Sequence, residues 1–509
     1  MIFDIRVQRD LRIPMADGTD LLADRYVPAA GCAAATILVR SPMGRRPLGI
    51  LYGVYFARHG FQVVVQDGRA DDDALPLSTE REDGLATVAW LRGQPWFDGT
   101  LALHGMSAMG FAHWTIATEV PELRAMSVHV GASSIADAIF TGGSTALESL
   151  LIWCSNHSFT TALMAPRRAR RAIASGAPTA ELDRLTGGAT VPFYQAAIAG
   201  DGTGNPVRRA LDHSHAPRET VAPVHLVGGW YDIFLPSLIR DYLALRAAGV
   251  AAHLTIGPWG HYHPHQFLTA NREALQWFRA HLRDDRAALR ALPVRVFVTG
   301  ARQWREYSDW PPPGIRSAAW YLHSAGRLSP HPPDTSGCDR YRYDPADPTP
   351  APRGPVIVGR SRPEDSRWVE SRPDLLTYTS EPLTGATEVI GTVTVHLHFR
   401  SGRSTADGPA APGSTTDFVV RLCDVGPDGR SFNICEGVRR VDIDDTGAVD
   451  VELWPIAHRF APGHRLRVHV CSAAVPRYVR HPEAVEQRIL RGPRTPSAVT
   501  LPILVTTTA

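Results

Sequence analysis

Short apolar runs rich in β-branched residues alternate with helical patterns over the first 140 or so residues of this 509-residue chain. The runs at 35–40 and 61–67 are continuous, which is typical of strands buried on both faces. Between them, residues 49–59 carry apolar side chains at helical spacing. Because parallel strands need a crossover connection, this order predicts a parallel sheet covered by helices on both faces.

The pattern changes twice further along the chain. Residues 146–219 show helices and loops without strand runs, and strand signals then resume. After Pro311-Pro312-Pro313, apolar residues alternate with period two between Gly/Pro turns, which predicts an all-β sandwich. We therefore predict an α/β domain at 1–145 and 220–312, a helical cap inserted at 146–219, and an all-β domain at 313–509.

Composition and charge exclude several classes of function. With 53 basic and 51 acidic side chains, the formal net charge is +2, so the chain has no positive excess with which to bind a nucleic-acid backbone. No apolar run approaches the roughly 20 residues of a membrane span, and we expect no secretion signal at the N-terminus. Every basic side chain is arginine, which excludes Schiff-base chemistry, the P-loop lysine and Ser-x-x-Lys nucleophile pairs.

The cysteines and histidines do not form a metal-binding pattern. Six cysteines are spread too widely for a metal motif or a disulfide framework, so we interpret them as buried apolar residues of a reduced, cytoplasmic protein. His261, His263 and His265 alternate, but Pro264 interrupts a regular strand and no nearby cysteine or carboxylate completes a ligand set. We expect no metal and no cofactor. The cysteines are Cys32, Cys154, Cys338, Cys423, Cys435 and Cys471.

A glycine-flanked serine follows the strand predicted at 100–104 and directly precedes a helix, in the run Leu103-His104-Gly105-Met106-Ser107-Ala108-Met109-Gly110-Phe111. Such an elbow exposes a serine hydroxyl at the edge of a sheet, and its neighbours are small because bulky side chains would collide with adjacent strands. The helix N-terminus adds backbone donors and a positive dipole end. Ser107 is therefore the candidate nucleophile.

A serine nucleophile needs a base, and the base needs an orienting acid. Downstream, one predicted strand runs into Gly228-Gly229-Trp230-Tyr231-Asp232 and the next into Gly257-Pro258-Trp259-Gly260-His261. The order Ser, Asp, His, with each residue after a strand, is that of α/β-hydrolases. Asp232 and His261 are 29 positions apart, which leaves room for one helix and one strand.

These motifs resemble the X-prolyl dipeptidyl-peptidase and cocaine-esterase group of α/β-hydrolases. The resemblance implies an α/β-hydrolase sheet with an inserted helical cap and a C-terminal all-β jelly-roll domain. It also implies that Ser107 is the nucleophile, His261 the base and Asp232 its orienting acid. Further matching stretches, which extend the resemblance over nearly the whole chain, are Gln66-Asp67-Gly68-Arg69, Trp96-Phe97-Asp98-Gly99, Tyr343-Asp344-Pro345-Ala346-Asp347-Pro348, Asp424-Val425-Gly426-Pro427-Asp428-Gly429 and Phe460-Ala461-Pro462-Gly463-His464-Arg465.

The resemblance also suggests the walls of an acyl pocket between the sheet and the cap. Phe234 follows the acid by two residues, and Trp153 lies in the cap segment. We predict that both are substrate-binding residues. Packing in the core is the alternative for each.

One position departs from the family pattern. The family usually has Arg-x-Pro-Tyr, whose tyrosine hydroxyl and the backbone N–H after the serine (here Ala108) bind the oxyanion. This chain has Met43 in place of the tyrosine, and loss of one donor typically costs about 10²–10³ in turnover. Three interpretations stay open. The N–H of Met43 or the hydroxyl of Tyr52 or Tyr55 substitutes, the enzyme is slow on a narrow substrate, or the scaffold performs another reaction.

The leading hypothesis is a serine hydrolase that cleaves an ester or amide bond of a small-molecule acyl substrate through an acyl-enzyme. The alternative, motivated by Met43, is a non-hydrolytic acyltransferase, cyclase or eliminase of a biosynthetic pathway. A binding protein with a vestigial triad is a third hypothesis. Cleavage of X-Pro peptides is less favoured, because we can assign no carboxylates to bind a peptide's amine. We expect neither nucleic acid nor membrane as a partner, and the oligomeric state, a homodimer included, is left open.

Overall fold

The computed structural model of the chain describes residues 2–29, 35–69, 75–155, 159–200, 204–359, 361–402, 413–443 and 446–505. It divides into two compact units. The first comprises Met1–Ala138 and Thr203–Arg295, and the second comprises Ile139–Gly202 and Val296–Ala509. Cys32 lies outside the described residues, and the other five cysteines are free thiols.

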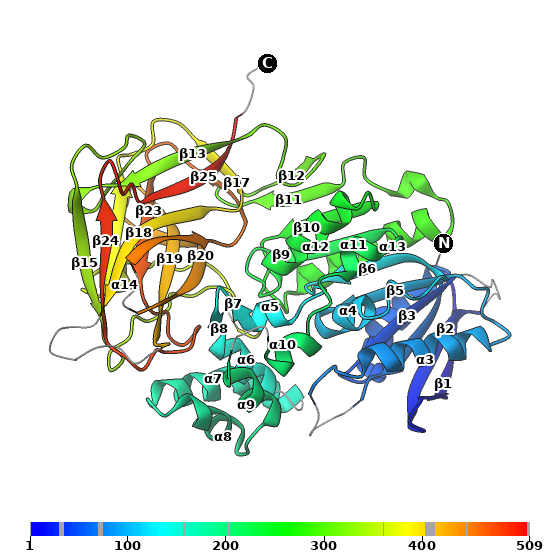
Figure 1. Cartoon of the computed structure of the whole chain (residues 1–509). Coiled ribbons are helices and arrows are strands. Elements are labelled where there is room, and N and C mark those ends of the chain that lie inside the picture. Colours follow the sequence, from blue (N-terminus) through cyan, green and yellow to red (C-terminus); the bar gives the residue numbers. More distant parts are fainter. Residues whose placement is uncertain are drawn as a thin grey trace. The chain divides into compact units, whose positions relative to one another are not determined.

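The first unit is built on a mixed sheet with the strand order β1-β2-β4-β3-β5-β6-β9-β10 (Figure 1). The strands from β4 to β10 pair in parallel, as the sequence predicts, whereas β2 pairs antiparallel with β1 and with β4. Neither β1 nor β2 is predicted from the sequence. Most of β1 is exposed, and its sequence has no apolar run. The bounds are β1 (Ile5–Pro14), β2 (Asp20–Pro28), β3 (Thr36–Ser41), β4 (Gln62–Asp67), β5 (Leu101–Met106), β6 (Leu123–His129), β9 (Val224–Gly229) and β10 (Ala252–Gly257).

Helices follow most of the parallel strands. Phe56, Phe61 and Phe278 belong to a core that joins the helical segment after β3 and helix α13 to the sheet. The sequence predicts the last helix at 271–281, but α13 begins at Pro264, since proline is favoured in the first turn, where its N–H is not needed. The bounds are α1 (Arg45–Leu48), the π-helical η1 (Gly49–Val54), α2 (Tyr55–Arg58), α3 (Glu80–Arg92), α4 (Ser107–Trp114), α10 (Pro206–Ala210), α11 (Ala216–Glu219), α12 (Leu235–Ala247), α13 (Pro264–Leu282) and η3 (Arg286–Ala288).

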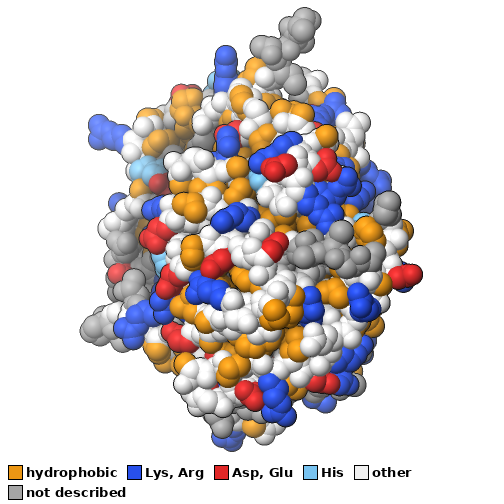
Figure 2. All heavy atoms as spheres, turned by 90° about the vertical axis from the view of Figure 1, so that its right-hand side faces the viewer, with side chains coloured by type: hydrophobic (Ala, Val, Ile, Leu, Met, Phe, Trp, Pro, Cys, Tyr) orange, Lys and Arg blue, Asp and Glu red, His pale blue; other side chains and the backbone are white. Residues whose placement is uncertain are grey.

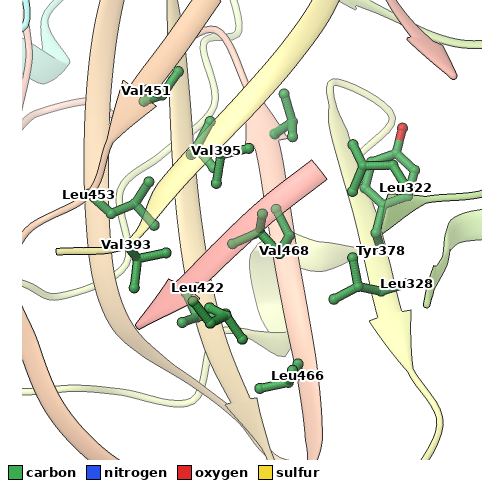
Figure 3. Packing of buried hydrophobic residues seen from close by; sticks show 14 of the residues in the cluster. Leu322, Leu328, Tyr378, Val393, Val395, Leu422, Val451, Leu453, Leu466 and Val468 are labelled. Atoms are coloured by element: carbon green, nitrogen blue, oxygen red, sulfur yellow. The ribbon is translucent and has the colours of Figure 1, made fainter. Parts of the chain in front are cut away.

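The second unit is dominated by β-structure. Among its described residues, thirteen strands pair into one branched sheet. Its interior is a cluster of buried aliphatic and aromatic side chains, and Figure 3 shows Val395, Leu422 and Val468 among those gathered there. The predicted all-β region is therefore confirmed. The bounds are β13 (Ile315–Leu322), β14 (Arg327–Ser329), β15 (Gly337–Tyr343), β16 (Leu375–Ser380), β17 (Thr387–Gly391), β18 (Thr394–Gly402), β19 (Thr415–Val425), β20 (Ser431–Asp442), β21 (Thr446–Glu452), β22 (Ile456–Phe460), β23 (Arg465–Cys471), β24 (Val485–Arg491) and β25 (Ala498–Leu504).

The predicted cap region is helical, and its two ends belong to different compact units. Residues up to 202 belong with the β-structure, to which backbone hydrogen bonds tie the short β7 and β8: Arg440 N–H donates to the Gly142 carbonyl (2.8 Å) and Val479 N–H to that of Thr145 (3.0 Å). The three-domain division stays a prediction. The bounds are β7 (Phe140–Thr141), β8 (Ser144–Thr145), α6 (Leu147–Cys154), α7 (Phe159–Ala174), η2 (Thr179–Glu181), α8 (Leu182–Gly187) and α9 (Pro192–Ile198).

Arginine side chains form ion pairs with carboxylates both at the surface and in the core. On the face shown in Figure 2, arginine and acidic side chains are interspersed with hydrophobic and neutral ones. Exposed pairs such as Arg81–Glu119 (2.6 Å) contribute at most about 1 kcal/mol each. The buried pair Arg40–Glu80 (2.6 Å) has a positional role, because Arg40 also donates to the Ala112 carbonyl and so links β3 to α4. None of the helices within the described ranges is both long and apolar enough to cross a bilayer.

Asp417 on β19 provides a test of pH-dependent stability within the second unit. Its buried carboxylate lies 3.0 Å from both His481 and Arg440. Burial alone would raise the pKa of Asp417, but these partners outweigh it and hold the pKa at about 2. An unfolded aspartate titrates near 3.9, so the unfolded chain takes up the proton first. The stabilisation, about 2–3 kcal/mol, is present above pH about 4 and is lost as the pH falls toward 2.

We therefore expect that Asp417→Asn destabilises the protein at neutral pH and makes its stability less dependent on pH between 4 and 2. Urea unfolding at several pH values checks both effects. The exposed aspartate Asp428 on a turn is the matched control, and Asp428→Asn should leave the pH profile unchanged. Parallel profiles for the wild type and Asp417→Asn would contradict the assignment.

Candidate active site

Ser107 lies on a tight turn between the end of β5 and the start of α4. Its φ of 52° is in the left-handed region, which is costly for a residue with a side chain and typical of strained functional turns. A Cβ on Gly105 would lie 2.7 Å from the Cβ of Met109, and one on Gly110 would lie 2.5 Å from Cγ1 of Val128 on the adjacent strand. The two glycines thus allow α4 to begin directly over the sheet.

The loops after β9 and β10 lie together because their strands are parallel neighbours. Trp230 N–H donates to the Gly257 carbonyl (2.9 Å) and Tyr231 N–H to that of Trp259 (3.0 Å). These bonds connect the loop that carries Asp232 to the loop that carries His261. The parallel strands all end at one sheet edge, so the loops meet the Ser107 turn there.

The structure brings Ser107, Asp232 and His261 together. His261 Nδ1 lies 2.7 Å from Asp232 Oδ1, and His261 Nε2 lies 3.0 Å from Ser107 Oγ. Asp232 and His261 are fully buried, whereas Ser107 is partly exposed. Since a carboxylate only accepts, Nδ1 carries the proton and donates to Asp232, which leaves Nε2 free to accept from the serine hydroxyl. This arrangement can remove the proton of Ser107.

Two aromatic rings flank the His261 imidazole. Phe234, buried just before α12, lies with its ring 5.7 Å from it, and the half-exposed Tyr262 lies edge-on at 4.7 Å. Tyr262 belongs to no motif that predicts a site residue, although its position next to the predicted base is a signal. Trp153 belongs to α6 of the second unit, where it packs edge-on against Phe193. The substrate-binding roles of Phe234 and Trp153 stay predictions.

The candidate oxyanion donors have different surroundings. Ala108 lies in the first turn of α4, where backbone N–H groups have no acceptor within the helix. The N–H of Met43 donates to Ser41 Oγ (3.1 Å), and the side chain of Met43 is 50% exposed. Tyr52 is fully buried, with its hydroxyl 3.2 Å from His129 Nε2, and the Tyr55 ring packs against Phe56. The roles of Ala108 and Met43 remain predictions.

The alternating histidines have other contacts than those of a metal site. His261 is bonded to Ser107 and Asp232, and His263 directly precedes the first turn of α13. Over the described parts of the chain, no three His, Cys, Asp or Glu side chains converge as a metal site would require.

A serine on a strand-to-helix elbow with a buried His–Asp pair behind it defines the class of serine hydrolases built on an α/β sheet. The family comparisons agree with this class. The family described as X-Pro dipeptidyl-peptidase (S15 family) matches residues 17–263, and the X-Pro dipeptidyl-peptidase C-terminal non-catalytic domain matches residues 289–500. The chain belongs to this S15 family of serine hydrolases, which confirms the predicted family resemblance.

Individual relatives match the chain along its whole length. The cocaine esterase of Rhodococcus sp. (strain MB1 Bresler) is 29% identical over 580 residues, covering 98% of each chain. The structure of an aminopeptidase from a marine-sediment Thaumarchaeota archaeon superposes with a TM-score of 0.82 at 22% identity, covering 99% of this chain and 97% of that one. An α-amino acid ester hydrolase superposes with a TM-score of 0.80 at 21% identity, covering 98% and 97%. The predicted α/β-hydrolase fold with a C-terminal all-β domain is thus confirmed.

Proposed function

We propose that this serine hydrolase cleaves an ester bond of a small-molecule acyl substrate through an acyl-enzyme on Ser107. The hydrogen-bonded chain from Asp232 through His261 to Ser107 carries the proposal. The names of two similar proteins, a cocaine esterase and an α-amino acid ester hydrolase, support ester chemistry. The name of a third, an aminopeptidase, keeps an amide bond as the other substrate class.

In this proposal the reaction has two halves, acylation of Ser107 and hydrolysis of the acyl-enzyme. Ser107 Oγ attacks the acyl carbon while His261 Nε2 takes its proton, and Asp232 stabilises the imidazolium that forms. The carbonyl oxygen gains negative charge, which the Ala108 N–H at the positive end of α4 stabilises. His261 returns the proton to the leaving alcohol as the C–O bond breaks. Water then attacks the acyl-enzyme with His261 as the base, releasing the acid and restoring Ser107.

Ser107→Ala tests the proposal. We expect the wild type to hydrolyse a nitrophenyl ester and to be labelled covalently by a fluorophosphonate, and we expect Ser107→Ala to do neither, because the nucleophilic oxygen is absent. Rates and mass spectra of the intact protein provide the measurements. Ser78→Ala, at an exposed serine of the same unit, is the matched control and should behave as the wild type. A label that survives in Ser107→Ala, or no label on the wild type, would refute the proposal.

A non-hydrolytic acyl transfer, cyclisation or elimination is the second candidate. It is favoured by Met43, whose side chain has no donor and whose N–H donates to Ser41 instead. We expect Met43→Tyr to raise the esterase rate by about 10-fold or more, because a restored oxyanion donor is typically worth 10²–10³. Product analysis with a nitrophenyl ester and an added amine or alcohol separates the candidates. Free acid as the sole product supports hydrolysis, and an acylated amine or alcohol supports transfer.

A further inference from the structure

His129, the last residue of β6, lies next to the segment that carries Ser107. It pairs in the sheet with Met106, which directly precedes Ser107. The chain after His129 turns sharply, with Val130 at a φ of 40°, and passes over the serine. A Cβ on Gly131 would lie 2.8 Å from the carbonyl oxygen of Ser107 and 3.0 Å from its nitrogen. The backbone after His129 thus packs directly on the peptide groups of the nucleophile.

The side chain of His129 contacts helix α13, which follows the loop that carries His261. Its Nδ1 lies 2.7 Å from Nε2 of Gln266, in the first turn of α13. Gln266 N–H in turn donates to the carbonyl of His263 (2.9 Å), two residues after His261. His129 and Gln266 are both fully buried, so water does not compete for their hydrogen bond. One side chain therefore connects the segment that supports Ser107 to the helix that follows the His261 loop.

The contacts of His129 also determine its protonation. An amide nitrogen only donates, so Nδ1 is the acceptor, and Nε2 carries the proton toward Tyr52 Oη at 3.2 Å. Burial lowers the pKa of His129 well below its usual value, and His104, His225 and His261 act in the same direction. His129 therefore stays neutral and adds no positive charge near His261 when that imidazole takes the proton of Ser107.

We propose that His129 is a positioning residue, which holds the Ser107 turn and the His261 loop in register through its hydrogen bond to Gln266. The inference rests on the proposed function, because it takes Ser107 and His261 as the reacting pair. Small displacements of reacting groups can cost about 10² in rate. We therefore expect His129→Leu to lower kcat and the rate of fluorophosphonate labelling of Ser107 by about 10- to 100-fold, with KM within about twofold of the wild type.

A set of variants separates positioning from simple loss of stability. His129→Asn places an amide near the position of Nδ1 and should recover most of the labelling rate, whereas Gln266→Leu should match His129→Leu. The double variant should be no slower than either single one, because all three remove the same bond. His225→Leu is the matched control: His225 is also buried and contacts α13 through Glu273, but it lies at the other end of its strand. It should lower the melting temperature without changing the labelling rate.

The outcomes distinguish this inference from the proposed function. A wild type that resists the fluorophosphonate overturns both. The role of His129 alone is overturned if the wild type is labelled, Ser107→Ala is not labelled, and His129→Leu is labelled as fast as the wild type. Equal losses in His129→Leu, His129→Asn and His225→Leu would also overturn it, because the loss would then follow core packing. Slow labelling in His129→Leu and Gln266→Leu, with recovery in His129→Asn, supports it.

Discussion

We expect Asp232→Asn to lower kcat by about 10⁴-fold while leaving the fold and KM nearly unchanged. The reason is the tautomer of His261: an amide nitrogen at this position donates to Nδ1, so the imidazole proton moves to Nε2, which faces Ser107 at 3.0 Å. Nε2 then cannot accept the serine proton, although every distance is preserved. A loss of about 10⁴ is the usual effect of this substitution in a Ser-His-Asp triad.

Steady-state kinetics on a nitrophenyl ester checks this expectation. Asp98→Asn is the matched control, because Asp98 is exposed and only accepts a hydrogen bond from Thr100 N–H in a turn. It should retain wild-type kcat. If Asp232→Asn stayed within tenfold of the wild type, Asp232 would not orient the base, and a different acid would have to be sought.

We expect Glu436→Gln to destabilise the second unit by about 3–5 kcal/mol. Glu436 on β20 is buried between two arginines, and it accepts from Arg421 Nε at 2.7 Å and from Arg477. Arg421 is completely buried, and among the described residues the N–H of Arg477 Nε has no acceptor. Burial alone would raise the pKa of Glu436, but the two guanidinium groups outweigh it and lower the pKa. Removing the carboxylate charge leaves two buried cations uncompensated, which typically costs this much.

Denaturant unfolding measures the loss. Glu381→Gln is the control, because Glu381 is exposed and lies 3.6 Å from Arg465. Exposed ion pairs contribute about 1 kcal/mol or less, so this variant should unfold almost as the wild type does. Similar unfolding free energies for the two variants would show that the buried Arg–Glu–Arg cluster does not stabilise the unit.

The residues of the candidate triad were predictable because their signals are local. The Ser107 elbow is a strand, a glycine-flanked turn and a helix start within nine residues, and Asp232 and His261 each follow a strand in the same way. Parallel neighbours end at one edge of the sheet, so three such turns converge there without further information. The distances of 2.7 and 3.0 Å among the three side chains agree with that expectation.

Other features of the fold and of the candidate site are not marked by any pattern in the nearby sequence. β1 is mostly exposed, so its sequence lacks the apolar run that marks a strand, and only pairing with β2 makes it one. Pro264 was interpreted as an interruption, but it starts α13 and so places Gln266 beside His129. The contact between Gln266 and His129 joins residues 137 positions apart, and no periodicity in the chain predicts it.

By itself, the sequence determined the α/β arrangement, the all-β C-terminal region and the three residues of the candidate triad. Each of these features depends on hydrophobic period, turn residues and chain order, which can be recognised in short stretches of sequence. Only the tertiary structure decided which partners the buried polar groups have, among them the bond between His129 and Gln266 and the cluster around Glu436. A buried polar group must find a partner wherever folding brings one within reach, and that partner can come from any part of the chain.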